Sequence, residues 1–450
     1  MTQLEILLRQ MKISIIILSL SIIVFSNSYS QTLNKKRLDS LFNVLQNREL
    51  ANGSVAISIN GKTLYQRAIG FAMLDSNNKK ILPDINTEYR VGSTSKMFTA
   101  TIIFQLIDEN KLSLDTKLAA YFPQLPNANK ITIEEMLYHR SGLHDYTHDT
   151  NFPNWMDKPK THEEMLKIIE SKGSDFEPGT KADYCNTNYL LLSYIIEKIA
   201  GMSYAEALNR RITSKIGLQH TYYGKPIDIR RNEATSYKYA DSSWKKEKET
   251  DVSIHGGAGS VVSTPTDLTV FIENIFNGKL INKANIDSMT TMIDDYGMGI
   301  FPYDFDSIKG YGHNGRIEEF YSATRYYPEK KLAVSYITNG ILFPRIDILE
   351  GILKICFNDD YEILFSKPVA IDFQKYIGTY SSNDLPFKVV CKKENDKLIF
   401  EAAGRTMEAK PVKTNYFMNL KTGSFFDFNP EKGELQIKET DNTYYLQKEK

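Results

Sequence analysis

Cysteine is scarce in this sequence, and neither sign of charge is in excess. The 450 residues include three cysteines, Cys185, Cys356 and Cys391. They are too few for a disulfide framework and leave room for one bridge of unassigned pairing. Lysine plus arginine number 55, as do aspartate plus glutamate. Balanced charge gives no reason to expect a nucleic acid as partner.

Long hydrophobic runs are also missing, apart from one near the start. Met11-Lys12 precedes the apolar stretch 13–25, and small polar residues follow at 26–30. This order predicts a signal peptide at residues 1–30, with Met11 as an alternative start. The stretch is shorter than the roughly 20 residues of a membrane span, and an uncleaved N-terminal anchor is the alternative. We expect an exported bacterial protein, periplasmic or extracellular, without a transmembrane span after signal cleavage.

The length of the chain favours one large and one small domain. A helical pattern at 33–46 and a hairpin pattern at 53–72, with its turn at Asn60-Gly61, begin an α+β layout. Short strand-like runs separated by turn residues follow a linker-like stretch at 359–368. We predict an α+β domain at 31–366 and a small antiparallel β-domain at 367–450.

Ser93 and Lys96 stand three apart at the head of an apolar run that predicts a buried helix to about residue 108. Side chains at this spacing share a helix face. A serine needs a base to become a nucleophile, and burial can turn a lysine into that base. The pair predicts a nucleophilic Ser93 activated by Lys96; the alternative is a helix-starting serine beside a surface lysine. The same spacing recurs in polar stretches, interpreted as solvated surface, at Ser76–Lys79, Ser242–Lys245 and Ser243–Lys246.

Tyr184 and Asn186 precede a predicted helix at 190–200. In an extended segment, residues two apart point to the same side. A tyrosine beside an ammonium can relay protons, and an asparagine amide can hold a substrate carbonyl or the lysine. The alternative is a tyrosine packed on the helix that the asparagine caps.

His313, Gly315 and Arg316 precede two predicted antiparallel strands at 320–327 and 332–338. Glycine permits close approach of a substrate. The Arg316 N–H, together with the Ser93 N–H, is a candidate oxyanion hole. His313 is a candidate proton or hydrogen-bond donor. The alternatives are a structural histidine in the sheet and His255, which shares the His-x-Gly spelling but precedes a helix.

The remaining histidine-rich stretch surrounds Asp145. Its residue types suit zinc, but their spacing matches no helix-borne metal motif, so we expect no metal and no cofactor. The three histidines are His139, His144 and His148. We also predict a helix at 131–142, a flexible turn at 256–260, and a helix through Ile275 as a wall of the cleft.

Three ordered motifs, Ser93-Thr94-Ser95-Lys96, Tyr184-Cys185-Asn186 and His313-Asn314-Gly315, give the chain a family resemblance. It resembles the serine β-lactamase and penicillin-binding-protein superfamily, closest to the class C β-lactamase, D-alanyl-D-alanine carboxypeptidase and esterase branch. The resemblance covers about residues 33–339. It implies an antiparallel sheet flanked by helices, with a mostly helical subdomain.

The resemblance also implies a role for each motif. Ser93 matches the acylated nucleophile, Lys96 its proton acceptor, and Tyr184 the general base. Asn186 matches the substrate-binding amide, and His313 to Gly315 the Lys-Thr-Gly element. A mostly neutral histidine binds a carboxylate less firmly than lysine does, which favours an esterase or peptidase over antibiotic hydrolysis.

The sequence therefore predicts a secreted serine hydrolase that forms an acyl-enzyme at Ser93. Its substrate would be a small molecule or a peptide with an ester or amide bond: a D-amino peptide, a small ester or a β-lactam. The alternative is a non-catalytic protein that binds peptidoglycan or another ligand on the same fold. A Gly-x-Ser-x-Gly hydrolase is disfavoured because that motif is absent. The oligomeric state is left open.

Overall fold

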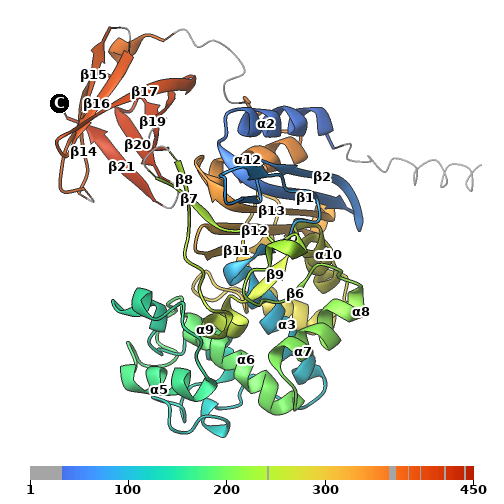
Figure 1. Ribbon diagram of the computed structural model, residues 1–450. Helices are drawn as coiled ribbons and strands as arrows, with labels where there is room; N and C mark the ends of the chain where they lie inside the picture. Colours follow the sequence, from blue (N-terminus) through green and yellow to red (C-terminus); the bar gives the residue numbers. More distant parts are fainter. Residues whose placement is uncertain are drawn as a thin grey trace, which may run out of the picture.

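A computed structural model describes residues 33–240, 243–363, 371–383, 385–395, 397–419, 422–439 and 442–449. Figure 1 shows a sheet with helices on both faces, a helical region beneath it, and a separate β-barrel. The predicted signal peptide at 1–30 and the predicted domain boundary at 366–367 lie outside the described residues. Within the described ranges, no helix is long and apolar enough to cross a membrane.

The central sheet has the antiparallel order β10-β11-β12-β13-β1-β2. The predicted hairpin is confirmed as β1 and β2, and both turn residues, Asn60 (φ 55°) and Gly61 (φ 74°), have the positive φ of a tight two-residue turn. The two predicted strands after Arg316 are confirmed as β12 and β13. The strands are β1 (Ala51–Ile59), β2 (Lys62–Ile69), β10 (Phe301–Pro302), β11 (Tyr311–Ile317), β12 (Phe320–Tyr327) and β13 (Leu332–Ile341).

Helices cover both faces of this sheet, so β1 is buried along its whole length. Helices α2 (Lys35–Asn47) and α12 (Arg345–Cys356) pack on one face of the sheet and share an apolar core with it. Helices α10 (Pro265–Phe276) and α3 (Ser95–Asp108) belong to the core on the second face, where Phe98 stacks on Phe271 at 3.7 Å. The prediction that the helix through Ile275 walls the cleft is wrong, because this helix packs on β1, β12 and β13 instead.

The helical region contains α4 (Ile133–Leu137), α5 (His162–Lys172), α6 (Asn186–Ala200), α7 (Tyr204–Leu208) and α9 (Val252–His255). The predicted helix at 131–142 is wrong beyond Leu137, because His139 (φ 58°) and Gly142 (φ 71°) adopt left-handed conformations that a helix does not allow. Helix α6 begins at Asn186, four residues earlier than predicted. The predicted flexible turn at 256–260 is wrong too: residues 256–258 form a buried 3₁₀ turn.

The C-terminal region is a closed antiparallel barrel of eight strands. The α+β fold class with an added all-β region is therefore confirmed. The strands are β14 (Gly378–Ser381), β15 (Val389–Glu394), β16 (Lys397–Ala402), β17 (Arg405–Lys413), β18 (Tyr416–Met418), β19 (Phe425–Asn429), β20 (Glu434–Lys438) and β21 (Thr443–Lys448).

The barrel is attached to the rest of the molecule by an apolar contact and a partly buried polar cluster. Phe425 packs edge-on against Phe343 at 4.6 Å. The Tyr416 hydroxyl donates to Asp347 at the start of α12, and Lys438 Nζ lies 3.6 Å from the same carboxylate. All three cysteines are buried, and none of them forms a disulfide.

Candidate active site

Ser93 lies in a 3₁₀ turn, Gly92–Thr94, that leads directly into α3. Strand β11 packs against this turn so closely that neither chain has room for a side chain. A Cβ on Gly315 would lie 1.9 Å from the Val91 carbonyl oxygen, and one on Gly92 would lie 2.8 Å from the Arg316 nitrogen. The two glycines therefore bring the backbone of β11 beside Ser93.

Hydrogen bonds from the neighbouring strand fix the same turn. The Ser322 hydroxyl on β12 donates to the Val91 carbonyl at 2.7 Å and contacts the Thr94 hydroxyl at 2.7 Å. On its other side, β11 pairs with β10 only through Gly312 and Tyr311. From His313 onward, β11 has no partner strand on this side within the described sheet, so an edge is available next to Ser93.

Lys96 is completely buried one turn after Ser93. Its Nζ lies 3.0 Å from Ser93 Oγ, 2.8 Å from Asn186 Oδ1 and 2.9 Å from the Ala258 carbonyl oxygen. Burial lowers the lysine pKa to about 7, and the nearby Asp145 carboxylate offsets part of this effect. Much of the amine is therefore uncharged near neutral pH, and it can accept a proton from the Ser93 hydroxyl.

Tyr184 is the second polar side chain beside the Ser93 hydroxyl, after Lys96. Its ring centre lies 4.8 Å from Lys96 Nζ. Burial raises the pKa of the phenol well above its usual range, although a hydrogen bond with Ser93 opposes this effect. The phenol consequently keeps its proton at neutral pH and can donate it.

His139 orients the Tyr184 segment. Its ring stacks on the Tyr184 ring at 4.5 Å, and its Nδ1 accepts a hydrogen bond from the Cys185 N–H at 3.0 Å. Burial, with Lys96 as the next cause, holds the His139 pKa well below its usual value. From the sequence, His139 was a candidate for metal binding only. No local pattern indicates its contact with a tyrosine 45 positions later.

Asn186 and Asp145 form a polar layer behind the lysine. Asn186 Nδ2 donates to Asp145 Oδ2 at 3.0 Å and to Thr147 Oγ1 at 3.2 Å, while its Oδ1 accepts from Lys96. Both ends of the amide are thus engaged, so the structure places Asn186 on the lysine, one of the two roles that the sequence left open. Asp145 is only 3% exposed, and the sequence did not identify it as a neighbour of Lys96.

His313 lies on β11 and is only 2% exposed. The Phe301 ring packs edge-on against it at 4.9 Å. Burial, and then Lys96, lower its pKa to about 3, so this histidine is neutral. Its Nδ1 contacts the Asn314 carbonyl, and its Nε2 is buried without a hydrogen-bond partner among the described residues. No positive charge therefore stands at this position of β11.

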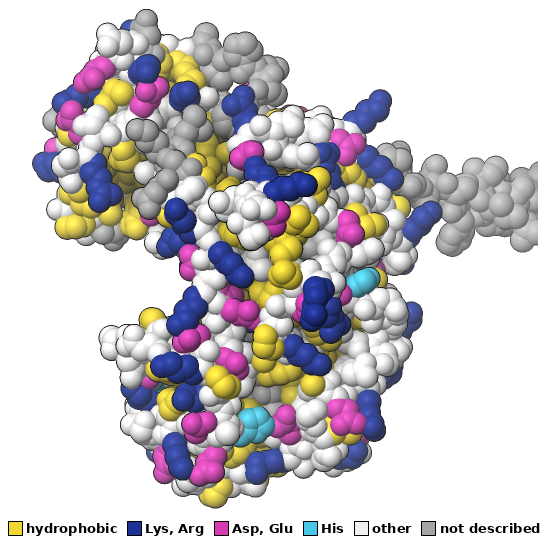
Figure 2. All heavy atoms as spheres, in the orientation of Figure 1, with side chains coloured by type: hydrophobic (Ala, Val, Ile, Leu, Met, Phe, Trp, Pro, Cys, Tyr) yellow, Lys and Arg dark blue, Asp and Glu magenta, His cyan; other side chains and the backbone are white. Residues whose placement is uncertain are grey.

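Two cavities meet at Ser93. One, of about 170 Å³, is lined by Asn186, Ala258 and His255; the other, of about 230 Å³, is lined by Tyr184 and His313. Arg316 borders both. His255, which the sequence left as the alternative to His313, thus also lies at the cleft. Burial lowers the pKa of His255 to about 4. On the face shown in Figure 2, basic and acidic side chains alternate with apolar ones.

The histidine-rich stretch is dispersed in the structure. His144 contacts Asp175 at 2.9 Å and Asp149 at 3.3 Å, whereas His139 packs on Tyr184. In the part of the chain that the structure describes, no group of three or more histidine, cysteine, aspartate or glutamate side chains is arranged to hold a metal ion.

Comparisons with known proteins identify the family. The family model described as "Beta-lactamase" matches residues 38–346. The chain belongs to the β-lactamase family. It is 29% identical over 261 residues to a teichoic acid D-alanine hydrolase of Staphylococcus aureus, a match that covers 58% of this chain and 62% of that one. The chain thus spans about three fifths of that relative.

Two further proteins resemble a longer part of the chain. Penicillin-binding protein 4* of Bacillus subtilis is 27% identical over 418 residues, covering 85% of this chain and 91% of its own. The crystal structure of D-amino acid amidase from Ochrobactrum anthropi SV3 superposes with a TM-score of 0.60 at 26% identity, covering 71% of this chain and 97% of its own. The teichoic acid D-alanine hydrolase and the D-amino acid amidase are both named for a reaction on a D-amino acid group.

Proposed function

We propose that the protein is an exported serine hydrolase that cleaves D-aminoacyl esters or amides through an acyl-enzyme at Ser93. The observation that carries the proposal is the 3.0 Å contact between Ser93 Oγ and the fully buried Lys96 amine, whose pKa is about 7. A base with such a pKa suits catalysis near neutral pH.

Acylation begins with attack of Ser93 Oγ on the substrate carbonyl carbon, while the neutral Lys96 amine accepts the hydroxyl proton. The carbonyl oxygen becomes an oxyanion, and the backbone N–H groups of Ser93 and Arg316 stabilise it. The close approach of Gly92 and Gly315 supports this role, because it brings the Arg316 backbone nitrogen beside the turn that carries Ser93.

Collapse of the tetrahedral intermediate requires a proton for the departing alcohol or amine. Tyr184 retains its proton at neutral pH, and its ring centre lies 4.8 Å from the Lys96 amine, so it donates to the leaving group and recovers a proton from Lys96. Water then attacks the acyl-enzyme, and the same groups act in reverse. Asn186 holds Lys96 in position rather than binding substrate.

The substrate class rests on two observations. The acyl group named for two relatives is a D-amino acid, released from a teichoic acid in one and from an amide in the other. In this chain, the neutral His313 supplies no cation at the position of the family's lysine, so a substrate carboxylate would depend on Arg316 and Arg345, which line the same cavity. The loss of the lysine favours substrates without a free carboxylate. A D-alanyl ester or amide has no such carboxylate.

The test is a substrate panel on the purified protein. D-Alanine methyl ester and D-alanine p-nitroanilide should be hydrolysed, their L-enantiomers much more slowly, and a D-Ala-D-Ala peptide and a cephalosporin poorly. Ser93→Ala should remove all ester cleavage, and intact-mass measurement of the wild type should detect a D-alanyl adduct.

The matched control is Ser95→Ala, since Ser95 is also buried near the start of α3 but donates to no group in the cleft and accepts from Val261 N–H. Hydrolysis that persists in Ser93→Ala would overturn the proposal. Binding of D-alanyl compounds without turnover, unchanged in Ser93→Ala, would instead favour the non-catalytic alternative.

A further inference from the structure

The interior of the β-barrel is filled at one end only. Aromatic side chains such as Phe400, Phe417 and Phe428 are almost fully buried and form its core. Met407, Ile437 and Tyr444 pack on this core but are only partly buried. The eight strands enclose a space that side chains can fill or a small ligand can occupy, and here the filling stops short of one end.

That open end forms a cavity of about 670 Å³, within the range of small-molecule sites. Inward-facing side chains at matching ends of the strands line it, and the strand register keeps them adjacent: Phe426 pairs with Ile437, and Ile437 with Tyr444. The hairpin β7 (Tyr237–Ala240) and β8 (Ser243–Lys246) reaches from the large domain to close one side. Figure 1 shows this hairpin between the sheet and the barrel.

The rim of the cavity carries more positive than unpaired negative charge. Lys238 on β7 and Arg405 on β17 both line it, and neither forms an ion pair with any described residue. The two carboxylates on the rim are Glu319 and Glu439. Glu319 already forms an ion pair with Arg316 at 3.2 Å, so two cations face one remaining carboxylate. The rim therefore favours an anionic group above an apolar pocket.

We propose that the open end of the barrel binds a single-chain amphiphile with an anionic head, a long-chain carboxylate. The chain lies against Met407, Phe426, Ile437 and Tyr444, and the carboxylate lies between Lys238 and Arg405. This site does not depend on the chemistry at Ser93.

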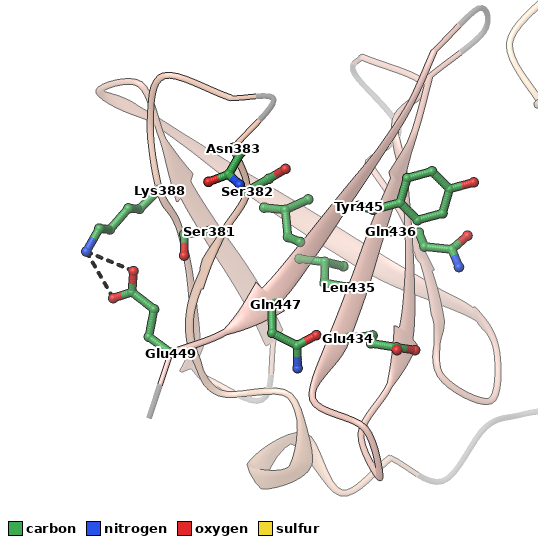
Figure 3. A pocket seen from close by; sticks show the side chains of 11 residues that line it. Ser381, Ser382, Asn383, Lys388, Glu434, Leu435, Gln436, Tyr445, Gln447 and Glu449 are labelled. Carbon is green, nitrogen blue, oxygen red and sulfur yellow. Dashed lines mark hydrogen bonds and ion pairs between the residues drawn. The ribbon is translucent and has the colours of Figure 1, made fainter.

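A second cavity of the barrel supplies a control. Strands β14 and β21 pair through Tyr380 with Lys448 and Ser381 with Gln447, and a cavity at this side of the barrel is lined by Ser381, Gln436 and Tyr445. Figure 3 shows Tyr445 and Ser381 on opposite sides of this cavity. The Tyr445 side chain is 63% exposed and does not line the open end of the barrel. Tyr444 and Tyr445 are thus adjacent residues of the same type with different surroundings.

The experiment is a fluorescence titration of the full chain with dansylaminoundecanoic acid, a single-chain carboxylate. We expect saturable binding of one probe per chain, displaced by dodecanoate but not by dodecylamine. Tyr444→Asp should weaken binding by about tenfold or more, because it puts a second carboxylate into the apolar pocket. Tyr445→Asp should change the affinity by less than about twofold.

A second pair of variants lies outside the barrel and tests the head group. Lys238→Glu should weaken binding several-fold, whereas Lys246→Glu, an exposed position on the same hairpin, should not. Unsaturable binding, equal displacement by the amine, or unchanged affinity in Lys238→Glu would overturn the proposal, whether or not Tyr444→Asp folds. Loss of binding in Ser93→Ala would place the probe in the cleft and would overturn it as well.

Discussion

The pH dependence of hydrolysis should follow the protonation of Lys96. Burial lowers the lysine pKa from the usual 10.5 to about 7, a change that corresponds to about 5 kcal/mol of lost preference for the ammonium form. Only the neutral amine accepts the Ser93 proton, so kcat/KM should rise with pH through about 7 and level off above it. At pH 6, about a tenth of the amine is neutral, and the rate should be about a tenth of the plateau.

Asp145→Asn should move this rise to lower pH. The Asp145 carboxylate raises the lysine pKa, and it is linked to Lys96 through the Asn186 amide. Removal of an opposite charge at such range shifts a pKa by about one pH unit or more. The relative rate at pH 6 should then rise from about a tenth to about half of the plateau, although the plateau itself should fall because the amide of Asn186 loses an acceptor.

The assay is release of D-alanine from its methyl ester, measured as kcat/KM between pH 5 and 9 at constant ionic strength. Asp149→Asn is the matched control: Asp149 is a nearby buried carboxylate, but it pairs with Lys172 at 2.8 Å and with His144 and does not act on Lys96. A profile without a rise between pH 6 and 8, or an identical midpoint in Asp145→Asn and the wild type, would refute the assignment of Lys96 as the base.

Three further predictions test the site and the attachment of the barrel. Gly315→Ala places a Cβ 1.9 Å from the Val91 carbonyl oxygen, so β11 must move by more than 1 Å and kcat/KM should fall about 100-fold. The control Gly201→Ala, whose Cβ would have no atom within 4 Å, should keep its activity. Equal rates of the two variants would contradict the close approach of β11 to Ser93. Lys96 stays protonated up to about pH 10.5 in the unfolded chain and only up to about pH 7 in the folded chain. The free energy of unfolding of the wild type, relative to that of Lys96→Met, should therefore rise by about 1.4 kcal/mol per pH unit between pH 8 and 10. A difference between the two proteins that does not change with pH would contradict the lowered pKa of Lys96. Tyr416→Phe removes the hydroxyl that donates to the partly buried Asp347, which should cost about 1–3 kcal/mol in urea unfolding and leave hydrolysis unchanged. An unchanged unfolding midpoint would show that this hydrogen bond does not hold the barrel in place.

Patterns that repeat along the chain were sufficient to predict much of the fold. The hairpin at Asn60-Gly61 and the strands 320–327 and 332–338 carry alternating or continuous apolar residues between turn signals, and each formed as predicted. The strand-like runs of the C-terminal region, at 387–391, 398–401, 416–420, 425–428, 435–437 and 444–446, correspond to six of the eight described barrel strands, and β14 and β17 were missed. Strand β14 is short, and β17 (Arg405–Lys413) is rich in charge and contains Pro411, so neither has the apolar alternation that identifies a strand.

The surroundings of Ser93 could be predicted only in part. Ser93 and Lys96 are one helical turn apart, so their contact follows from local geometry. The contacts of Lys96 with Ala258 and of His139 with Cys185 join segments far apart in the sequence. They depend on tertiary packing, and single-sequence patterns do not encode it. The left-handed conformation of His139 likewise ends a helix that periodicity alone extends.

The buried histidines decide what the cleft can titrate. His139, His255 and His313 surround the lysine, and for each of them burial is the first cause and Lys96 the second cause of a lowered pKa. All three are therefore uncharged near neutral pH, which leaves the lysine as the group whose charge changes there. Below about pH 7 the ammonium of Lys96 offsets the Asp145 carboxylate, and above it the lysine no longer does. Arg316 and Arg345, which also line the cleft, keep their charge throughout. The same loss of charge on Lys96 thus activates the nucleophile and removes one positive charge from the interior of the cleft.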